Sequence, residues 1–125
     1  PRLRENFIER IFIYSEWQSL SKINLDASKL VAFHTRHKLT LLAHSPTTYK
    51  HLGQLLSNLK QNNLQELSNI YINTLMRAMS YLTTPKKHAN VLQHCLGYFK
   101  KQLEPLDKQE LLQAIDEYRM GLVPL

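Results

Sequence analysis

Among the side chains of the segment 27–44 that can bind anions or metal ions are His34, His37 and Lys38. At about 100° per residue of an expected helix, they lie with His44 on or beside an apolar face. Buried imidazoles and ammonium groups are costly without partners. One interpretation is satisfied core imidazoles, with Lys38 reaching water. A second interpretation is a pocket for an anion or small molecule, lined by His34, His37, Lys38, His44 and His88.

A metal site is the third interpretation of this segment. His34 and His37, three residues apart, are neighbours on a helix and can share an ion. His44 lies seven residues further on, roughly 10 Å along the axis, so it cannot join them in one coordination sphere. A zinc ion would need ligands from the segment 85–103, namely His88, His94 or Cys95. We therefore expect neither a metal ion nor a cofactor.

The segment 85–103 divides into an apolar face and a basic face. The basic face carries cations with amide and imidazole donors and has one aromatic residue at its border: Lys86, Lys87, Asn90, His94, Lys100, Lys101 and Tyr98. The alternative to a binding surface is an ordinary solvated face. Against it, no acidic residue occurs between Met76 and Gln102. Such a face suits phosphate contacts and base stacking, and Arg36 and Lys38 extend it if the segment 27–44 lies alongside.

The charge of the whole chain follows the same pattern. The formal net charge of the 125 residues is +6, but residues 29–101 alone carry ten basic residues and one acidic residue, for +9. A central block of this kind favours anionic partners. Catalysis by paired carboxylates is unsupported, because nine of the ten acidic residues lie in the flanking segments. We expect no catalytic residues, so the chain alone is more an accessory domain than an enzyme.

Composition indicates one globular domain over residues 1–125. With 43% hydrophobic residues the chain can bury a core, and its single cysteine, Cys95, forms no internal disulfide, which is typical of a reducing cytosol. On the apolar face of its segment, Cys95 is expected to pack as a small hydrophobe rather than act as a nucleophile. No apolar run is long enough to span a membrane. We predict a cytoplasmic protein.

The elements that position these residues are predicted to be helices. Ser45-Pro46 and Thr84-Pro85 each pair a capping hydroxyl with a proline at the first helical position. Asp26 is a third cap, and Gly121 suits a left-handed helix end. The motifs that begin at Asn63 and Asp107, NLQE and DKQE, resemble capping boxes. Leucine stripes at helical spacing support the assignment. The expected fold is all-α, a compact bundle of six helices near 4–20, 27–44, 46–60, 64–82, 85–103 and 108–120.

Several sequence blocks also resemble a known family. They are NFIER at 6–10, LVAFHTRHKL at 30–39, AHSP at 43–46, NVLQH at 90–94, GYFKKQL at 97–103 and YRMGLVPL at 118–125. In this order they are similar to the YbgA-like domain, a bacterial family of unknown function. The resemblance spans nearly the whole chain. Relatives continue beyond the last block, so a C-terminal segment is expected to be missing here.

The resemblance implies a partner. Domains of this family occur alone or fused to a desulfidase-like domain similar to thiouracil desulfidases, which use an iron–sulfur cluster. In such fusions the YbgA-like part is thought to bind tRNA. We therefore expect a non-catalytic RNA-binding domain, with tRNA as the ligand, that presents its substrate to a fused or partner iron–sulfur enzyme. The alternatives are a small-molecule or metal-binding enzyme at the His34, His37 and Lys38 pocket, and a protein-interaction adaptor.

Overall fold

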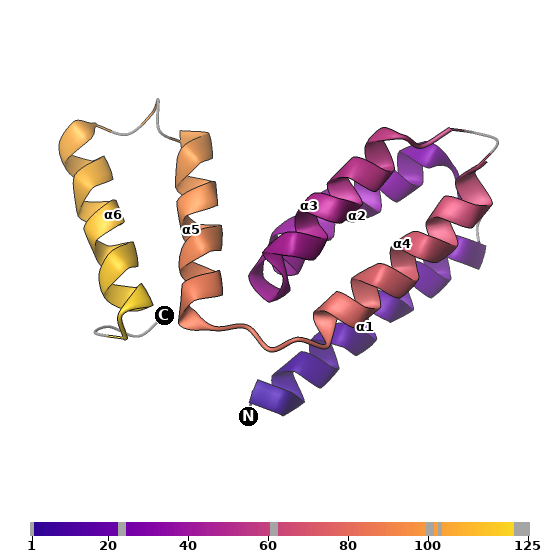
Figure 1. Ribbon diagram of the computed structural model, residues 1–125, viewed down its shortest axis with the longest axis horizontal. Helices are drawn as coiled ribbons and strands as arrows, with labels where there is room; N and C mark the ends of the chain where they lie inside the picture. Colours follow the sequence, from indigo (N-terminus) through magenta and orange to yellow (C-terminus); the bar gives the residue numbers. More distant parts are fainter. Residues whose placement is uncertain (1, 23–24, 61–62, 100–101, 103, 122–125) are drawn as a thin grey trace. The chain divides into compact units, whose positions relative to one another are not determined.

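The chain folds into six α-helices, and no strand occurs in the described residues. The structure is a computed structural model and describes residues 2–22, 25–60, 63–99, 102 and 104–121. The helices are α1 (Arg2–Lys22), α2 (Ala27–His44), α3 (Pro46–Ser57), α4 (Leu64–Met79), α5 (Pro85–Phe99) and α6 (Pro105–Arg119) (Figure 1). The all-α fold expected from the sequence is confirmed.

Three of the expected helix starts are held by the caps that the sequence indicates. The Asp26 carboxylate accepts a hydrogen bond from the Lys29 amide at 2.7 Å. The Ser45 and Thr84 hydroxyl oxygens accept from the amides of Thr48 and Lys87, each at 3.2 Å. These bonds satisfy amides that have no partner inside the helix.

The end of α6 also follows the prediction. Gly121 has a φ of +81°, the left-handed conformation in which glycine costs least.

Two capping predictions are wrong. The last helix begins at Pro105, with Glu104 as its N-cap, and not at 108. Proline is favoured at the first helical position, because its φ is already helical and its missing N–H costs nothing there, so Asp107 lies inside the first turn. Asn63 makes no side-chain capping bond to α4. Its side-chain oxygen instead accepts from the Lys60 amide at 2.8 Å, which closes the preceding loop.

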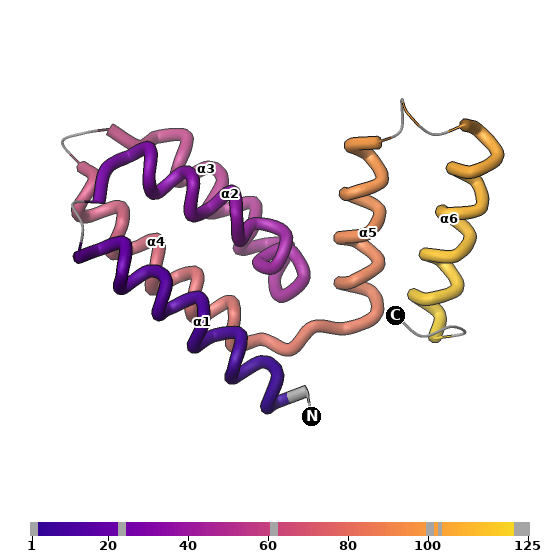
Figure 2. The backbone as a smooth tube through the Cα atoms, turned by 180° about the vertical axis from the view of Figure 1, so that it is seen from behind, coloured from indigo at the N-terminus to yellow at the C-terminus, as the bar shows by residue number. Residues whose placement is uncertain are grey.

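The chain divides into two compact units, residues 1–82 and residues 83–125. In the first unit, α2 packs against α3 and α4, α3 packs against α4, and α1 packs against α4. Figure 2 shows these four helices from behind. The second unit consists of α5 and α6, which pack against each other. The single domain expected over residues 1–125 stays a prediction.

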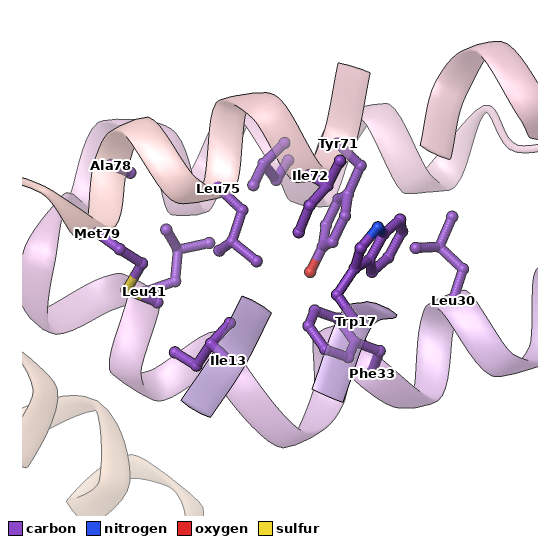
Figure 3. Close-up of a cluster of buried hydrophobic side chains, with 11 residues drawn as sticks. Ile13, Trp17, Leu30, Phe33, Leu41, Tyr71, Ile72, Leu75, Ala78 and Met79 are labelled. Atoms are coloured by element: carbon purple, nitrogen blue, oxygen red, sulfur yellow. The ribbon is translucent and has the colours of Figure 1, made fainter. Parts of the chain in front are cut away.

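The core of the first unit is built around three aromatic rings. Trp17 of α1 meets Phe33 of α2 edge to face at a centroid distance of 5.2 Å, and Tyr71 of α4 lies 5.8 Å from Trp17. Figure 3 shows these rings among the buried aliphatic side chains. Phe33 and Tyr71 have no exposed surface. Burial of rings of this size contributes much of the free energy that holds four short helices together.

Helical spacing places Leu30, Val31 and Leu41 on one face of α2. Leu30 and Leu41 are fully buried, as is Phe33, but Val31 is 45% exposed. Phe33 and His37 face α1, whose Trp17 and Glu16 contact them. Helical periodicity alone does not say which neighbour covers which side, and here α1 supplies the cover.

The second unit has a small core. Its buried residues are Ala89 and Leu96 of α5 and Ile115 of α6, and Tyr118 packs against them. Leu111 and Leu112, which form a stripe at helical spacing with Ile115 on the last helix, are 43% and 40% exposed. Only Ile115 of that stripe faces α5 in the buried cluster. In the part of the chain described, no helix is long and apolar enough to cross a membrane.

Candidate nucleic-acid interface and histidine clusters

The polar side of α5 is exposed to solvent. Lys86, Asn90, His94 and Tyr98 are all exposed and follow one another at intervals of four residues. Residues with this spacing lie on one face of a helix, so the four form a single row, here named the α5 polar stripe. The His94 and Tyr98 rings meet edge to face with their centroids 5.8 Å apart. Positive charge, amide donors and an aromatic surface are therefore presented together.

The remaining residues of the predicted basic surface have different surroundings. Lys87 of α5 is half-buried, so it stands at the edge of the stripe. Lys100 and Lys101 lie outside the described residues. Arg36 and Lys38 belong to α2, in the first unit. The α5 polar stripe is thus the part of the predicted surface whose geometry the structure describes within one element.

Arg36 and His37 share one acidic partner on α1. Glu16 Oε1 accepts from the Nε and Nη2 of Arg36, at 2.9 and 2.5 Å, and Glu16 Oε2 lies 2.6 Å from His37 Nε2. Partial burial acts to raise the pKa of Glu16, but the hydrogen bonds from His37 and Arg36 outweigh it and hold that pKa below its usual value. Arg36 is therefore paired with a carboxylate, although its side chain is 51% exposed.

His44 occupies a second cluster, seven residues along α2. Its side chain is 4% exposed; Nε2 lies 2.5 Å from Glu9 Oε1, and Nδ1 lies 2.5 Å from the Tyr81 carbonyl oxygen. A carboxylate and a carbonyl both accept hydrogen bonds, so the doubly protonated imidazolium is the form that satisfies both. His44 is thereby a buried link between α1, α2 and the segment after α4.

His34 has a different partner from His37 and His44. Its Nδ1 lies 3.0 Å from the hydroxyl of Tyr71, a side chain with no exposed surface. Burial raises the pKa of the Tyr71 phenol, which keeps its proton. Burial of the His34 ring, together with the charge of Lys38, lowers the pKa of His34. His34 and Lys38 both line an open hollow of about 440 Å³ between α2 and α3.

Within the first unit, the structure does not bring His34, His37, Lys38 and His44 of the predicted pocket together. His34 and Lys38 share the hollow, whereas His37 and His44 lie against Glu16 and Glu9 of α1. His88 belongs to the second unit, where its Nδ1 lies 2.7 Å from the Tyr118 hydroxyl and the two rings stack. No three histidine, cysteine, aspartate or glutamate side chains gather to hold a metal ion within the described residues.

Sequence reasoning missed the acidic partners of the α2 histidines. Glu9 and Glu16 are seven residues apart on α1, and His37 and His44 are seven apart on α2. Antiparallel helices joined by a short loop bring such pairs opposite each other, Glu16 to His37 and Glu9 to His44. The matching interval is present in the sequence and is the signal that was available.

Comparisons with known proteins find a family model and a protein to which this chain is similar. Residues 38–125 match a family model described as a protein of unknown function, DUF1722. Over 125 residues the chain is 34% identical to the uncharacterized protein YbgA of Escherichia coli strain K12, and the match covers 99% of this chain and 74% of that protein. No solved structure matches the chain.

Proposed function

The chain belongs to the family of YbgA and the DUF1722 proteins of unknown function, and from this premise we propose that it binds RNA, with tRNA as the ligand. The α5 polar stripe is the contact surface of this proposal. The domain is itself non-catalytic and presents the RNA to a fused or partner desulfidase-like iron–sulfur enzyme. Such a division of labour assigns substrate binding to one fold and chemistry to another.

The observation that carries the proposal is the composition and exposure of the stripe. All four of its residues are exposed, and α5 contains no acidic residue that would repel a phosphate. In RNA the phosphates attract lysines, and amide and imidazole groups can donate to sugars and unstacked bases. The exposed Tyr98 ring offers a surface on which a base can stack. Each residue thus has a role in one binding mode.

Charge reversal tests the proposal within a single helix. We expect Lys86→Glu to weaken tRNA binding by about tenfold, because one phosphate contact is lost and a repulsion is added. Tyr98→Ala should weaken binding by a similar factor if a base stacks on the ring. Fluorescence anisotropy with labelled tRNA at low salt measures both, and circular dichroism confirms that the helices remain.

Lys108→Glu is the matched control, because it makes the same charge change on α6, in the same unit but off the stripe. We expect its effect to be under about threefold, the result of net charge alone. Equal losses for Lys86→Glu and Lys108→Glu would contradict the assignment of the stripe. An unstructured RNA of equal length, bound as tightly as tRNA, would contradict the choice of tRNA.

A further inference from the structure

The hollow between α2 and α3 has a lining suited to an anion. Its volume of about 440 Å³ lies in the range of small-molecule sites. The described residues on its wall include two lysines and one histidine and no acidic residue: His34, Thr35, Lys38, Tyr49, Lys50, Gly53, Gln54 and Ser57. A small anionic molecule therefore meets no repelling group on this wall.

Helical spacing explains why these residues converge. His34 and Lys38 are four residues apart on α2, and Lys50 and Gln54 are four apart on α3, so each pair lies on one face of its helix. Gly53 leaves the space between the helices open. Apart from its chain neighbours and the backbone of its own helix, a Cβ atom added at Gly53 would meet no atom within 4 Å. Gly53 thus leaves part of the wall without a side chain in the middle of a helix, where glycine is otherwise unfavourable.

The two aliphatic hydroxyl groups on the wall are already used. Thr35 Oγ1 donates to the Val31 carbonyl oxygen at 2.9 Å, and Ser57 Oγ donates to the Gln54 carbonyl oxygen at 2.6 Å. Their protons stay on their own helices. The donors left for a ligand are the two lysine ammonium groups, the Gln54 side-chain amide and the imidazole of His34.

The buried Tyr71 hydroxyl bears on which ring nitrogen of His34 carries the proton. The buried Tyr71 phenol keeps its proton and lies 3.0 Å from His34 Nδ1, so it can donate to that nitrogen. The proton of the neutral imidazole is then on Nε2, which serves as a donor. A hydrogen bond to one ring nitrogen likewise fixes the tautomer and orientation of histidines at metal sites. His34 is held in one tautomer beside Lys38 rather than being free to rotate.

Lys38 and Lys50 have no acidic partner among the described residues, in contrast to Arg36 two positions before Lys38, which is paired with Glu16. A phosphate monoester carries close to two negative charges at neutral pH and accepts several hydrogen bonds. It can balance both ammonium groups, whereas a phosphodiester carries one charge. The hollow has room beyond a phosphate, and the ring of Tyr49 on its wall provides an apolar surface.

We propose that this hollow binds a nucleoside monophosphate ester, with Lys38, Lys50 and His34 Nε2 on the phosphate. Two sources supply this group: a free nucleotide, and the 5′-phosphate end of an RNA. The site lies in the first unit and is argued without the α5 polar stripe, so it stands whether or not that stripe binds RNA.

The test uses the full chain and two kinds of probe. Adenosine 5′-monophosphate and inorganic phosphate are titrated by NMR, which follows the His34 ring signals. A labelled RNA is compared with a 5′-phosphate and with a 5′-hydroxyl. We expect the nucleotide to bind more tightly than inorganic phosphate, and the 5′-phosphate RNA to bind about tenfold more tightly than the 5′-hydroxyl form. A response to the nucleotide identifies a free ligand, and a preference seen only with RNA identifies the RNA end.

Three variants connect these responses to the hollow. Lys38→Gln/Lys50→Gln removes both charges, and Gly53→Leu fills the space; each should abolish nucleotide binding and the 5′-phosphate preference. Because a side chain at Gly53 meets open space and leucine favours a helix, Gly53→Leu should keep or raise thermal stability. Lys60→Gln is the control, since Lys60 does not line the hollow.

The proposal is overturned if adenosine 5′-monophosphate does not bind and the 5′-phosphate RNA binds no more tightly than the 5′-hydroxyl RNA. It is also overturned if Gly53→Leu binds the nucleotide as tightly as the unchanged chain does. Inorganic phosphate bound as tightly as the nucleotide also contradicts it, because the nucleoside would then contribute nothing. Lys86→Glu separates this inference from the α5 polar stripe. That variant should weaken overall RNA affinity while the ratio between 5′-phosphate and 5′-hydroxyl RNA stays the same.

Discussion

Replacement of His44 by alanine should destabilise the first unit strongly. The His44 side chain is 4% exposed and connects the Glu9 carboxylate to the Tyr81 carbonyl oxygen, each at 2.5 Å. Hydrogen bonds that involve a charged group contribute about 1.5–3 kcal/mol each, and an acceptor left buried without a partner adds a further cost. Glu9 is 41% exposed, so water replaces much of its lost bond. We therefore expect a loss of about 2–4 kcal/mol in the free energy of unfolding.

For a folded unit of 60–100 residues, each kcal/mol lowers Tm by about 4–8 °C, so Tm should fall by at least about 8 °C. Trp17 is the single tryptophan and lies in the core of this unit, so its fluorescence follows the unfolding in urea or on heating. His51→Ala is the matched control, because His51 is exposed on α3, and it should change the free energy of unfolding by less than about 0.5 kcal/mol.

A double-mutant cycle then separates the two bonds of His44. Glu9→Gln alone should cost about 0.5–1.5 kcal/mol, and its cost should shrink when His44 is already alanine, because the two side chains share one interaction. If His44→Ala costs no more than His51→Ala, the reasoning that His44 is a buried structural link is refuted. Additive losses in the cycle would refute the Glu9 pairing alone.

Two further predictions concern stability in the first unit. Because the pKa of Glu16 is lower in the folded protein than its ordinary value of 4.5, its contribution is present above that value and is lost as pH falls through the folded pKa; Glu16→Gln should flatten the acid limb of a urea-denaturation series monitored by Trp17, and an unchanged limb would contradict the shift. Gly53→Ala should raise the free energy of unfolding by up to about 1 kcal/mol in the same assay, since the added methyl group meets open space, and a loss of stability would show that the position is constrained.

Helix starts were predictable where the signal is local. Asp26, Ser45 and Thr84 act on amides within three residues, so no knowledge of the tertiary fold is needed. The capping-box pattern at Asp107 predicts a start of α6 at 108, whereas Pro105, with its fixed φ, sets the start. Helix type and number thus follow from the sequence, whereas a boundary between two competing signals does not.

The partners of the α2 histidines were not predictable from α2 alone. Periodicity places His37 and His44 on an apolar face, but their partners are two carboxylates on another helix, Glu16 and Glu9. Which side of α2 meets α1 depends on how Trp17 and Phe33 pack, and periodicity does not encode that choice. The basic face of α5 could be predicted from that helix alone, because its sequence contains lysines and no acidic residue.

The salt dependence of tRNA affinity tests the proposed function most directly. Each lysine that neutralises a phosphate should add about 0.7–0.9 to the magnitude of the slope of log affinity against log salt concentration. We expect a slope of about −2 or steeper for the full chain, and a slope about 0.7–0.9 shallower for Lys86→Ala. Affinity that does not change with salt, or a slope that Lys86→Ala leaves unaltered, would contradict RNA binding through the α5 polar stripe.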